Sequence, residues 1–345
     1  MVTTRREWLV GAMGARAMWA AGRRLRAGQE RWIETVMGPC RADELGLVLP
    51  HEHVLVDFIG AEQASPDRYD RGEVVRVVVP YLRQARERGV GTLFECTPAY
   101  LGRDPVLLRR LAEASGLKLV TNTGYYAANG GKHLPAHAHT EGADALARRW
   151  IGEAREGIGE TGIRPGFIKI GVDAGPLDAM GRKLIEAAAR THRATGLTIA
   201  AHTGDGRAAM EQLDILAAEG IAASAWIWVH AQVEADGRLH REAAERGAWV
   251  EFDGLGPGTV ADHVALVDSL RRAGHLERVL VSHDGGWYHV GEPEGGPFRG
   301  YETLVDAFVP ALRAAGWTEG EVEQLTRRNP AAAFTLGIRR VDRRR

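Results

Sequence analysis

The sequence predicts a single-domain α/β protein, a (β/α)₈ TIM barrel over residues 30–345, preceded by a short leader over residues 1–29. Short apolar segments alternate with amphipathic ones along the chain, which is typical of parallel strands enclosed by helices. Glycines shortly before many of these strands are typical of helix ends. The length of 345 residues suits one barrel. A doubly wound open sheet is the competing architecture, but no glycine-rich phosphate loop follows the first strand.

Eight apolar segments are the predicted barrel strands. They span residues 48–58, 91–96, 117–123, 166–172, 197–202, 226–230, 249–252 and 279–282. Between them, Ala, Leu, Arg and Glu recur at a spacing of three to four residues, which predicts helices with one buried face. These helices are expected over residues 74–88, 105–114, 143–158, 182–195, 208–220, 239–246 and 264–273.

The composition excludes several classes of protein. Hydrophobic residues make up 45% and charged residues 26% of the chain, as in ordinary globular proteins. The net charge of −1 provides no broad basic field for nucleic acid or anionic membrane, which leaves a small-molecule substrate open. Two cysteines, Cys40 and Cys96, are too few for a cysteine-rich zinc module or a disulfide scaffold. Any metal must therefore be held by His, Asp, Glu or Lys.

The leader carries the pair Arg5-Arg6 before a modestly apolar stretch over residues 8–21. This arrangement resembles a twin-arginine export signal, which would place the protein in the periplasm or outside the cell. Arg16 interrupts the stretch, so a cytoplasmic protein with a basic leader is the alternative. The stretch is too short and too interrupted to span a membrane.

The first predicted strand contains His51 and His53 within the segment Leu49-Pro50-His51-Glu52-His53-Val54. Because side chains alternate along a strand, both imidazoles are expected on one face. Two imidazoles on a buried face suggest a shared metal ion, and two exposed histidines at a strand end are the alternative.

Four later strands place further candidates near the same end of the barrel. Lys169 lies inside the apolar strand 166–172, and His202, His230 and Asp284 lie at or just after strand ends. The carboxyl ends of barrel strands meet at one mouth, where active sites are built. We therefore expect these four residues to join the histidine pair.

Lys169 has three interpretations, because a buried amine must lose its charge, find a partner or be modified. It could reach the rim or pair with a carboxylate. It could form a Schiff base, as in aldolase-type barrels, but that chemistry needs no surrounding histidines. Carbamylation by carbon dioxide would instead make it an anionic ligand able to bridge two metal ions.

This ordered set resembles the phosphotriesterase family of the amidohydrolase superfamily. The resemblance runs from about residue 34 to residue 338 and includes the segments Asp43-Glu44-Leu45-Gly46, Gly102-Arg103-Asp104-Pro105 and Arg328-Asn329-Pro330-Ala331. It implies a hydrolase with two divalent ions, zinc as first choice, and a homodimer. The implied ligands are His51, His53 and Asp284 for the more buried ion and His202 and His230 for the more exposed one.

The resemblance further implies that N6-carboxylated Lys169 and a hydroxide bridge both ions. The hydroxide would attack the substrate, and Asp284 would be the catalytic group that accepts a proton. His283, which precedes Asp284, is expected to face away from the ions and to support their ligands.

The seventh strand departs from the family pattern. An arginine follows the aspartate of this strand in phosphotriesterase-like lactonases, and organophosphate hydrolases have a histidine there, whereas Gly254 follows Asp253 here. The organophosphate histidine is missing here, and Ala231-Gln232 follows His230 without the acidic pair of the organophosphate enzymes. Because these relay residues are missing, lactone or carboxylic ester hydrolysis is the first choice, and phosphotriester hydrolysis is the alternative. A catalytically silent ligand-binding barrel is the alternative of another class. Asp253 could orient a metal ligand or substrate, or simply cap a loop.

Several residues near the mouth have weaker predictions. His133, His137 and His139 are expected in a solvated loop, and Tyr125 and Tyr126 are candidates for lining the pocket. The glycine-rich, aromatic segment over residues 285–297 is predicted to be a lid. The remaining histidines on predicted helices are expected to be surface or packing residues: His192, His240, His263 and His275.

Overall fold

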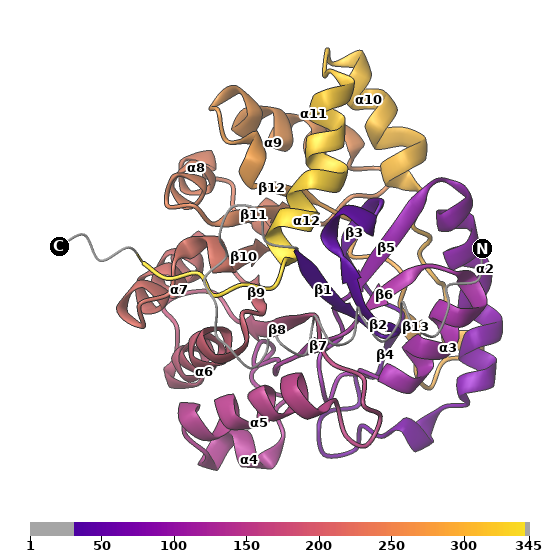
Figure 1. Ribbon diagram of the computed structural model, residues 1–345, viewed down its shortest axis with the longest axis vertical. Helices are drawn as coiled ribbons and strands as arrows, with labels where there is room; N and C mark the ends of the chain where they lie inside the picture. Colours follow the sequence, from indigo (N-terminus) through magenta and orange to yellow (C-terminus); the bar gives the residue numbers. More distant parts are fainter. Residues whose placement is uncertain (1–30, 342–345) are drawn as a thin grey trace.

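The protein is described by a computed structural model over residues 31–341, and its central strands form a parallel barrel surrounded by helices (Figure 1). The fold confirms the predicted single (β/α)₈ barrel. The leader, with its predicted export signal, lies outside these described residues. Within residues 31–341 no helix is long and apolar enough to cross a membrane.

The barrel strands match the predicted apolar segments in order. They are β3 (Leu47–Glu52), β5 (Val90–Glu95), β6 (Lys118–Val120), β7 (Asn122–Thr123), β8 (Phe167–Val172), β9 (Thr198–Thr203), β10 (Trp226–Val229), β11 (Trp249–Phe252) and β12 (Val279–Val281). The third predicted strand is thus divided into β6 and β7. The side chain of Asn122 at this division donates hydrogen bonds to the backbone oxygens of Glu95 (3.0 Å) and Thr97 (2.9 Å).

The first strand is shorter than predicted. It ends at Glu52, and the next short strand, β4 (Leu55–Val56), leaves the barrel to pair with β13 (Tyr288–His289). The barrel closes between β12 and β3, where the backbone N–H of Asp284 donates to the oxygen of His51 at 3.1 Å. The His51–His53 segment therefore lies where the last strand meets the first.

Seven helices on the outside follow the predicted ones closely. They are α2 (Arg71–Glu87), α3 (Pro105–Ser115), α5 (Ala143–Glu156), α6 (Ala179–Thr195), α7 (Gly206–Ala218), α8 (Gly237–Glu245) and α9 (Val260–Arg272). Aspartate side chains cap the first turns of five of them: Asp70, Asp104, Asp178, Asp205 and Asp236. Gly116 and Gly196 end α3 and α6 in the left-handed conformation that glycine adopts without strain.

The other described elements lie outside the barrel strands. β1 (Trp32–Thr35) and β2 (Gly38–Arg41) form an antiparallel hairpin, and α4 (Ala136–Thr140) lies in the loop after β7. After β12 come α10 (Val309–Ala314), α11 (Glu319–Glu323) and α12 (Asn329–Phe334), together with π-helical turns over Leu304–Phe308 and Gln324–Arg328.

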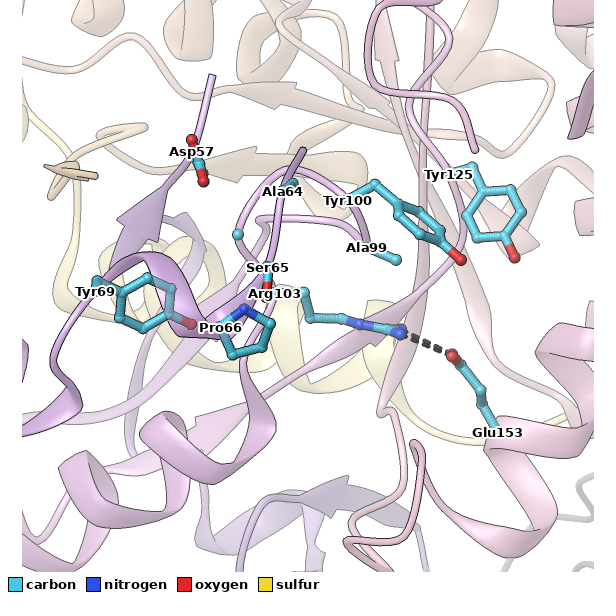
Figure 2. Close-up of a pocket in the computed structure, with 11 residues that line it drawn as sticks. Asp57, Ala64, Ser65, Pro66, Tyr69, Ala99, Tyr100, Arg103, Tyr125 and Glu153 are labelled. Carbon is cyan, nitrogen blue, oxygen red and sulfur yellow. Dashed lines mark hydrogen bonds and ion pairs between the residues drawn. The ribbon is translucent and has the colours of Figure 1, made fainter. Parts of the chain in front are cut away.

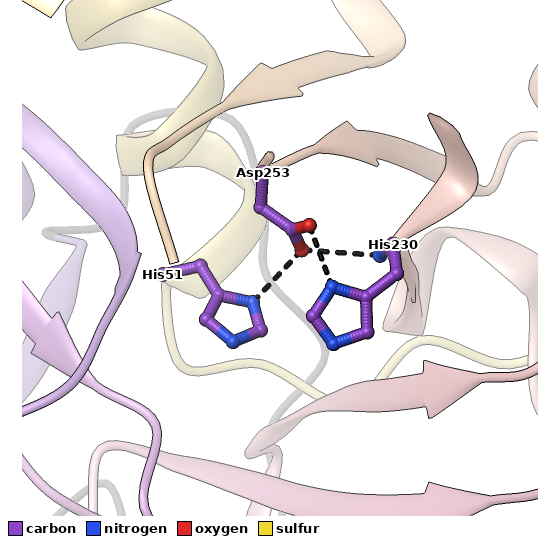
Figure 3. A group of neighbouring side chains, drawn as sticks. All are labelled: His51, His230 and Asp253. Carbon is purple, nitrogen blue, oxygen red and sulfur yellow. Dashed lines mark hydrogen bonds and ion pairs between the residues drawn. The ribbon is translucent and has the colours of Figure 1, made fainter. Parts of the chain in front are cut away.

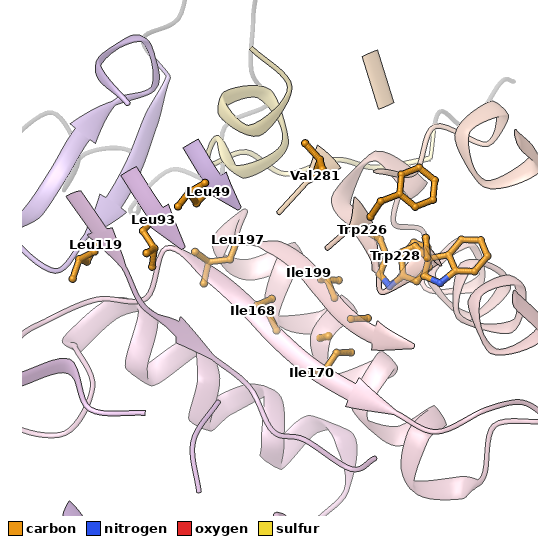
Figure 4. Packing of buried hydrophobic residues seen from close by; sticks show 14 of the residues in the cluster. Leu49, Leu93, Leu119, Ile168, Ile170, Leu197, Ile199, Trp226, Trp228 and Val281 are labelled. Carbon is orange, nitrogen blue, oxygen red and sulfur yellow. The ribbon is translucent and has the colours of Figure 1, made fainter. Parts of the chain in front are cut away.

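Alternation along the strands separates two apolar layers. Outward-facing residues such as Ile168 and Ile170 pack in the large cluster between the strands and helices (Figure 4). Inward-facing Phe94 and Phe167 fill the amino end of the barrel with Phe334 of α12, whose ring stacks on Phe94 at 3.9 Å between centroids. The amino end is therefore a closed apolar core, and polar groups are left to the carboxyl end.

Candidate metal centre

The six predicted site residues converge at the carboxyl end of the barrel. Nζ of buried Lys169 lies 3.4 Å from Nε2 of His51. Oδ1 of Asp284 lies 3.0 Å from Nε2 of His53 and 3.6 Å from Nε2 of His51. The sequence therefore identified a real cluster, although its members come from strands up to 233 positions apart.

The remaining two histidines complete the same cluster. The ring of His230 lies 5.1 Å from that of His51 and 4.5 Å from that of His202, between centroids. His202 lies on β9, whereas His230 follows β10 with a φ of 63°. This left-handed conformation is uncommon for a residue with a side chain and often marks a functional constraint.

Two buried carboxylates, Glu251 and Asp253, contact the Nδ1 atoms of His51 and His230. Nδ1 of His51 lies 3.0 Å from Asp253 and 3.2 Å from Glu251. Nδ1 of His230 donates to Asp253 at 2.6 Å, and its backbone N–H donates to the same carboxylate at 3.0 Å (Figure 3). Such contacts fix the ring so that Nε2 faces the opposite side. Asp253 thus orients histidines, which was one of its two predicted roles.

Glu251 was not identified from the sequence. It lies on the inner face of β11, two residues before Asp253 and two after Trp249, and it is fully buried. An acidic residue within an otherwise apolar strand was the available signal, because strand alternation places residues 249, 251 and 253 on one face.

The other two rings have neutral hydroxyl partners. Nδ1 of His53 lies 2.7 Å from the hydroxyl of buried Thr97, and the hydroxyl of Tyr126 lies 3.2 Å from Nε2 of His202. Burial raises the pKa of Tyr126, so this hydroxyl keeps its proton at neutral pH. Tyr126 therefore belongs to the centre, as predicted for a pocket-lining residue.

Burial and charge divide the histidines into two kinds. Burial lowers the pKa of His53 to about 4 and, with the charges of His230 and Lys169, also lowers that of His202. Burial and Lys169 act in the same direction on His51, but Asp253 and Glu251 outweigh them and raise its pKa to about 10. His53 and His202 are consequently neutral at pH 7 and able to donate a lone pair to a metal.

The donor set fits a divalent cation. Ligand atoms of His51, His53 and Asp284 lie within 4.8 Å of one another. Oδ1 of Asp284 is buried and accepts no well-oriented hydrogen bond from the described residues. Burial alone would raise the pKa of Asp284, but its contacts with His53 and His51 keep it below the usual range. A buried, ionised and unsatisfied oxygen beside two imidazoles is suited to a positive ion.

A second group with metal-like spacing contains His51, His230 and Asp253. Here the histidine nitrogens nearest the carboxylate are the two Nδ1 atoms, already 2.6 and 3.0 Å from Asp253. These are hydrogen-bonding distances, so we interpret this group as the support of the ligands rather than as a further metal site.

Aromatic side chains cover one side of the centre. Trp287 lies 4.5 Å from His53 between ring centroids and stacks on half-exposed Phe58 at 5.7 Å. Its indole N–H donates to the backbone oxygen of Asp284 at 2.7 Å, and its φ is 77°. The first part of the predicted lid segment therefore packs over His53 and is hydrogen-bonded to the loop that carries Asp284.

The solvated-loop prediction was wrong for His133, which is buried and lies 6.0 Å from Phe58 between ring centroids. His137 and His139 lie in the short helix α4, and the hydroxyl of Tyr125 lies 2.9 Å from Nε2 of His137. The physical reason is packing by Leu134 and Ala138, which ties this loop to the core. Three histidines of the outer helices are buried packing residues, as expected: His192, His240 and His263. His275 lies in the turn after α9 and not on a helix as predicted.

A separate cavity of about 270 Å³ lies among the loops after β4, β5 and β7 (Figure 2). Its walls include Tyr69, Tyr100 and Tyr125, and Arg103 and Glu153 form an ion pair at 2.7 Å on one side. Tyr125 lines this cavity, whereas the adjacent Tyr126 faces His202. The two neighbouring tyrosines therefore belong to different sites.

The barrel and its buried His, Lys and Asp cluster define a metal-dependent hydrolase of the barrel type. Residues 31–334 match the model of the phosphotriesterase family, and the chain belongs to that family. This confirms the resemblance noted from the sequence, and the amidohydrolase superfamily is consistent with it.

Related proteins agree with this assignment. The chain is 29% identical over 296 residues to the phosphotriesterase homology protein of Escherichia coli, covering 85% of this chain and 99% of that protein. It is 30% identical to an organophosphorus hydrolase from Deinococcus radiodurans, with a TM-score of 0.80, and the match covers 91% of this chain and 99% of that one. It is also 30% identical to a mutant PTE-like lactonase from the same organism, with a TM-score of 0.79, and the match covers 88% of this chain and 99% of that one.

Proposed function

We propose that the protein is a binuclear metal-dependent hydrolase that cleaves a lactone or a carboxylic ester. The observation that carries this proposal is the convergence of four histidines, buried Lys169 and ionised Asp284 at one barrel mouth. When bound, a pair of divalent ions lowers the pKa of water towards about 7 and polarises the ester oxygen.

The ligands divide into two groups. His51, His53 and Asp284 would hold one ion, and His202 and His230 would hold the other. His51, whose pKa is raised in the metal-free protein, would give up its Nε2 proton on metal binding. Zinc is our first choice, because imidazole and carboxylate ligands suit it.

Lys169 has a distinct role in this proposal. As an amine it lies 3.4 Å from Nε2 of His51, where a cation would oppose metal binding. N6-carboxylation would turn it into an anionic oxygen ligand shared by both ions. Its burial supports this modification, because the ordinary ammonium group is poorly accommodated there.

Asp284 is the proposed catalytic base. Its lowered pKa keeps it ionised at neutral pH, and about a quarter of its side chain remains exposed. It could therefore accept the proton of the attacking water and return it to the leaving alkoxide, which departs as the alcohol while the acid is formed. Trp287, packed against His53, would limit the access of other water to this position.

The substrate preference rests on the seventh strand. Asp253 is engaged by His51, His230 and Gln232 and is followed by Gly254, so this strand offers no further proton-relay side chain at this position. The similarity to a PTE-like lactonase supports a lactone or ester, and the similarity to an organophosphorus hydrolase supports a phosphotriester as the alternative. A silent ligand-binding barrel is the alternative of another class.

A screen of substrates and metals tests this proposal. The protein is stripped with a chelator, reloaded with Zn²⁺, Mn²⁺ or Co²⁺, and assayed on lactones, aryl esters and phosphotriesters. We expect about two ions per chain and hydrolysis only after reloading, with lactones or esters preferred. A chain that takes up no ions and only binds ligands would support the silent barrel. A preference for phosphotriesters would reverse the substrate assignment.

Two further proposals concern the whole protein. We propose that the Arg5-Arg6 leader directs export, which replacement of both arginines by lysine in the full chain should abolish, as followed by cell fractionation. The family resemblance also leads us to propose a homodimer, which sedimentation analysis tests directly. A monomer, or export that survives the replacement, would contradict the respective proposal.

A further inference from the structure

Glu52 lies between the two histidines of the His51–His53 segment, and its side chain is completely buried. Its Oε1 accepts hydrogen bonds from the hydroxyl of Ser282 (2.7 Å) and from Nδ1 of His283 (2.6 Å). The backbone N–H of His283 also donates to Oε1 at 3.1 Å, and that of Gly285 donates to Oε2 at 2.8 Å. Four donors from one loop therefore surround a single carboxylate.

The direction of these hydrogen bonds is settled by the outer partner of His283. Nε2 of His283 accepts from the backbone N–H of Leu304 at 3.0 Å, so Nδ1 carries the hydrogen that is donated to Glu52. The hydroxyl of Ser282 accepts from the backbone N–H of His51 at 3.1 Å and donates its own hydrogen to Glu52. Each group has one consistent role in this network.

The bound loop is the one that carries Asp284. Asp284 has a φ of 50°, a left-handed conformation that costs free energy for a residue with a side chain. Glu52 holds the residues on both sides of it, His283 and Gly285. A β-carbon on Gly285 would meet Oε2 of Glu52 at 3.1 Å, so the loop packs closely on the carboxylate.

We infer that Glu52 is a positioning residue for the metal centre: it clamps the Asp284 turn to the strand that carries His51 and His53. This inference rests on the proposed function. The clamp compensates the strained backbone of Asp284 and keeps its carboxylate close to His53. Metal affinity should therefore depend on Glu52, although Glu52 contacts no metal ligand atom directly.

Glutamine cannot replace glutamate in this role. Both oxygens of Glu52 accept from N–H or O–H groups, whereas an amide has one accepting oxygen and one donating NH₂ group. In either orientation the NH₂ group would face a donor. Glu52→Gln thus changes almost no volume but breaks the clamp at one end.

The test compares Glu52→Gln with the matched change Glu153→Gln. Glu153 forms an ion pair with Arg103 at 2.7 Å beside the separate cavity, outside the metal centre. Zn²⁺ affinity is measured by competition with a chromogenic chelator, and the melting temperature is measured on metal-free protein. We expect Glu52→Gln to weaken Zn²⁺ binding by about 10–100-fold. Glu153→Gln should bind Zn²⁺ with an affinity within about twofold of wild type, a much smaller change than the one expected for Glu52→Gln.

Other outcomes overturn the inference in distinguishable ways. If Glu52→Gln lowers only the melting temperature and binds Zn²⁺ like the wild type, Glu52 has a structural role alone. If Glu52→Gln does not fold, Ser282→Ala removes one donor from the clamp, and unchanged affinity in that variant refutes the idea. If the wild-type chain itself takes up no Zn²⁺, the proposed function fails as well.

Discussion

The two ends of the barrel are built from the same strands but contain opposite kinds of residue. At the amino end the inner face of β8 contributes Phe167, and two residues later the same face contributes Lys169. Likewise β11 contributes Trp249 near one end, then Glu251, and the chain continues to Asp253. Stability and chemistry are therefore divided along the length of each strand, and changes at the two ends should affect different properties.

The largest effect is expected for Lys169→Ala at the carboxyl end. We expect kcat/KM to fall on the order of 10³-fold or more, because the change would remove the proposed bridging ligand from an electrostatically organised site. The control is Lys118→Ala, which alters a half-buried lysine at the start of β6. Metal analysis should show fewer bound ions only in Lys169→Ala, and full activity in that variant would contradict the bridging role.

At the amino end, Phe94→Ala should act on stability instead. Phe94 is fully buried and packs on Phe334 and Phe167. Its truncation is expected to lower the free energy of unfolding by about 3–5 kcal/mol. Urea denaturation measures this loss, and metal content and kcat of the folded protein should remain unchanged. Loss of metal in a folded variant would show that the two ends are not independent.

A histidine far from the metal centre should determine part of the acid sensitivity. His192 is buried in α6, where Nδ1 donates to the oxygen of Leu197 (2.7 Å) and Nε2 accepts from the backbone N–H of Arg339 (2.9 Å). Burial lowers its pKa from 6.5 to about 4. The unfolded chain therefore binds more protons between these values, and stability is lost as the pH falls from about 6.5 to about 4.

This contribution amounts to about 3 kcal/mol, since each pKa unit corresponds to about 1.4 kcal/mol. The variant His192→Gln should reduce the slope of unfolding free energy against pH in that window. The measurement is urea denaturation at several pH values on metal-free protein. An unchanged slope would mean that His192 does not control the acid response.

Asp253→Asn tests the supporting layer of the carboxyl end. We expect metal affinity to fall by about 10–100-fold, because an amide can accept from only one of the two histidine Nδ1 atoms. Chelator competition measures this change. The control is Asp236→Asn, which alters a partly exposed helix cap on α8. Wild-type affinity in Asp253→Asn would restrict this carboxylate to a packing role.

The smallest effect is expected at the rim. Phe58 is 40% exposed and stacks on Trp287. Phe58→Ala should raise KM by about 2–10-fold with little change in kcat, because the substrate would lose about one aromatic contact. Steady-state kinetics with an aryl ester and an alkyl lactone separates a substrate contact from a general effect. If Phe58→Ala has the same kcat and KM as the wild type on each of the two substrates, Phe58 does not contact the substrate.

The sequence by itself determined the order of strands and helices, because apolar periodicity and glycines at helix ends are local signals. It also placed Lys169 within a strand and His202 at a strand end, and strand alternation puts both on the inner face with Phe167 and Ala200. Tertiary structure decided the rest of the centre. From Leu49 to Glu52 the strand β3 advances by three positions, whereas its partner β5 advances by two, from Leu93 to Glu95, and this bulge changes the simple alternation near His51.

Likewise, only the closed barrel brought Asp284 to His53 and Glu52 to the loop after β12. His230 and Asp284 depend on left-handed backbone conformations at 63° and 50°, which side-chain periodicity does not encode. The supporting carboxylates Glu251 and Asp253 likewise meet their histidines only across the barrel. The physical reason is that alternation acts between neighbours in sequence, whereas these contacts exist only after the last strand has closed on the first.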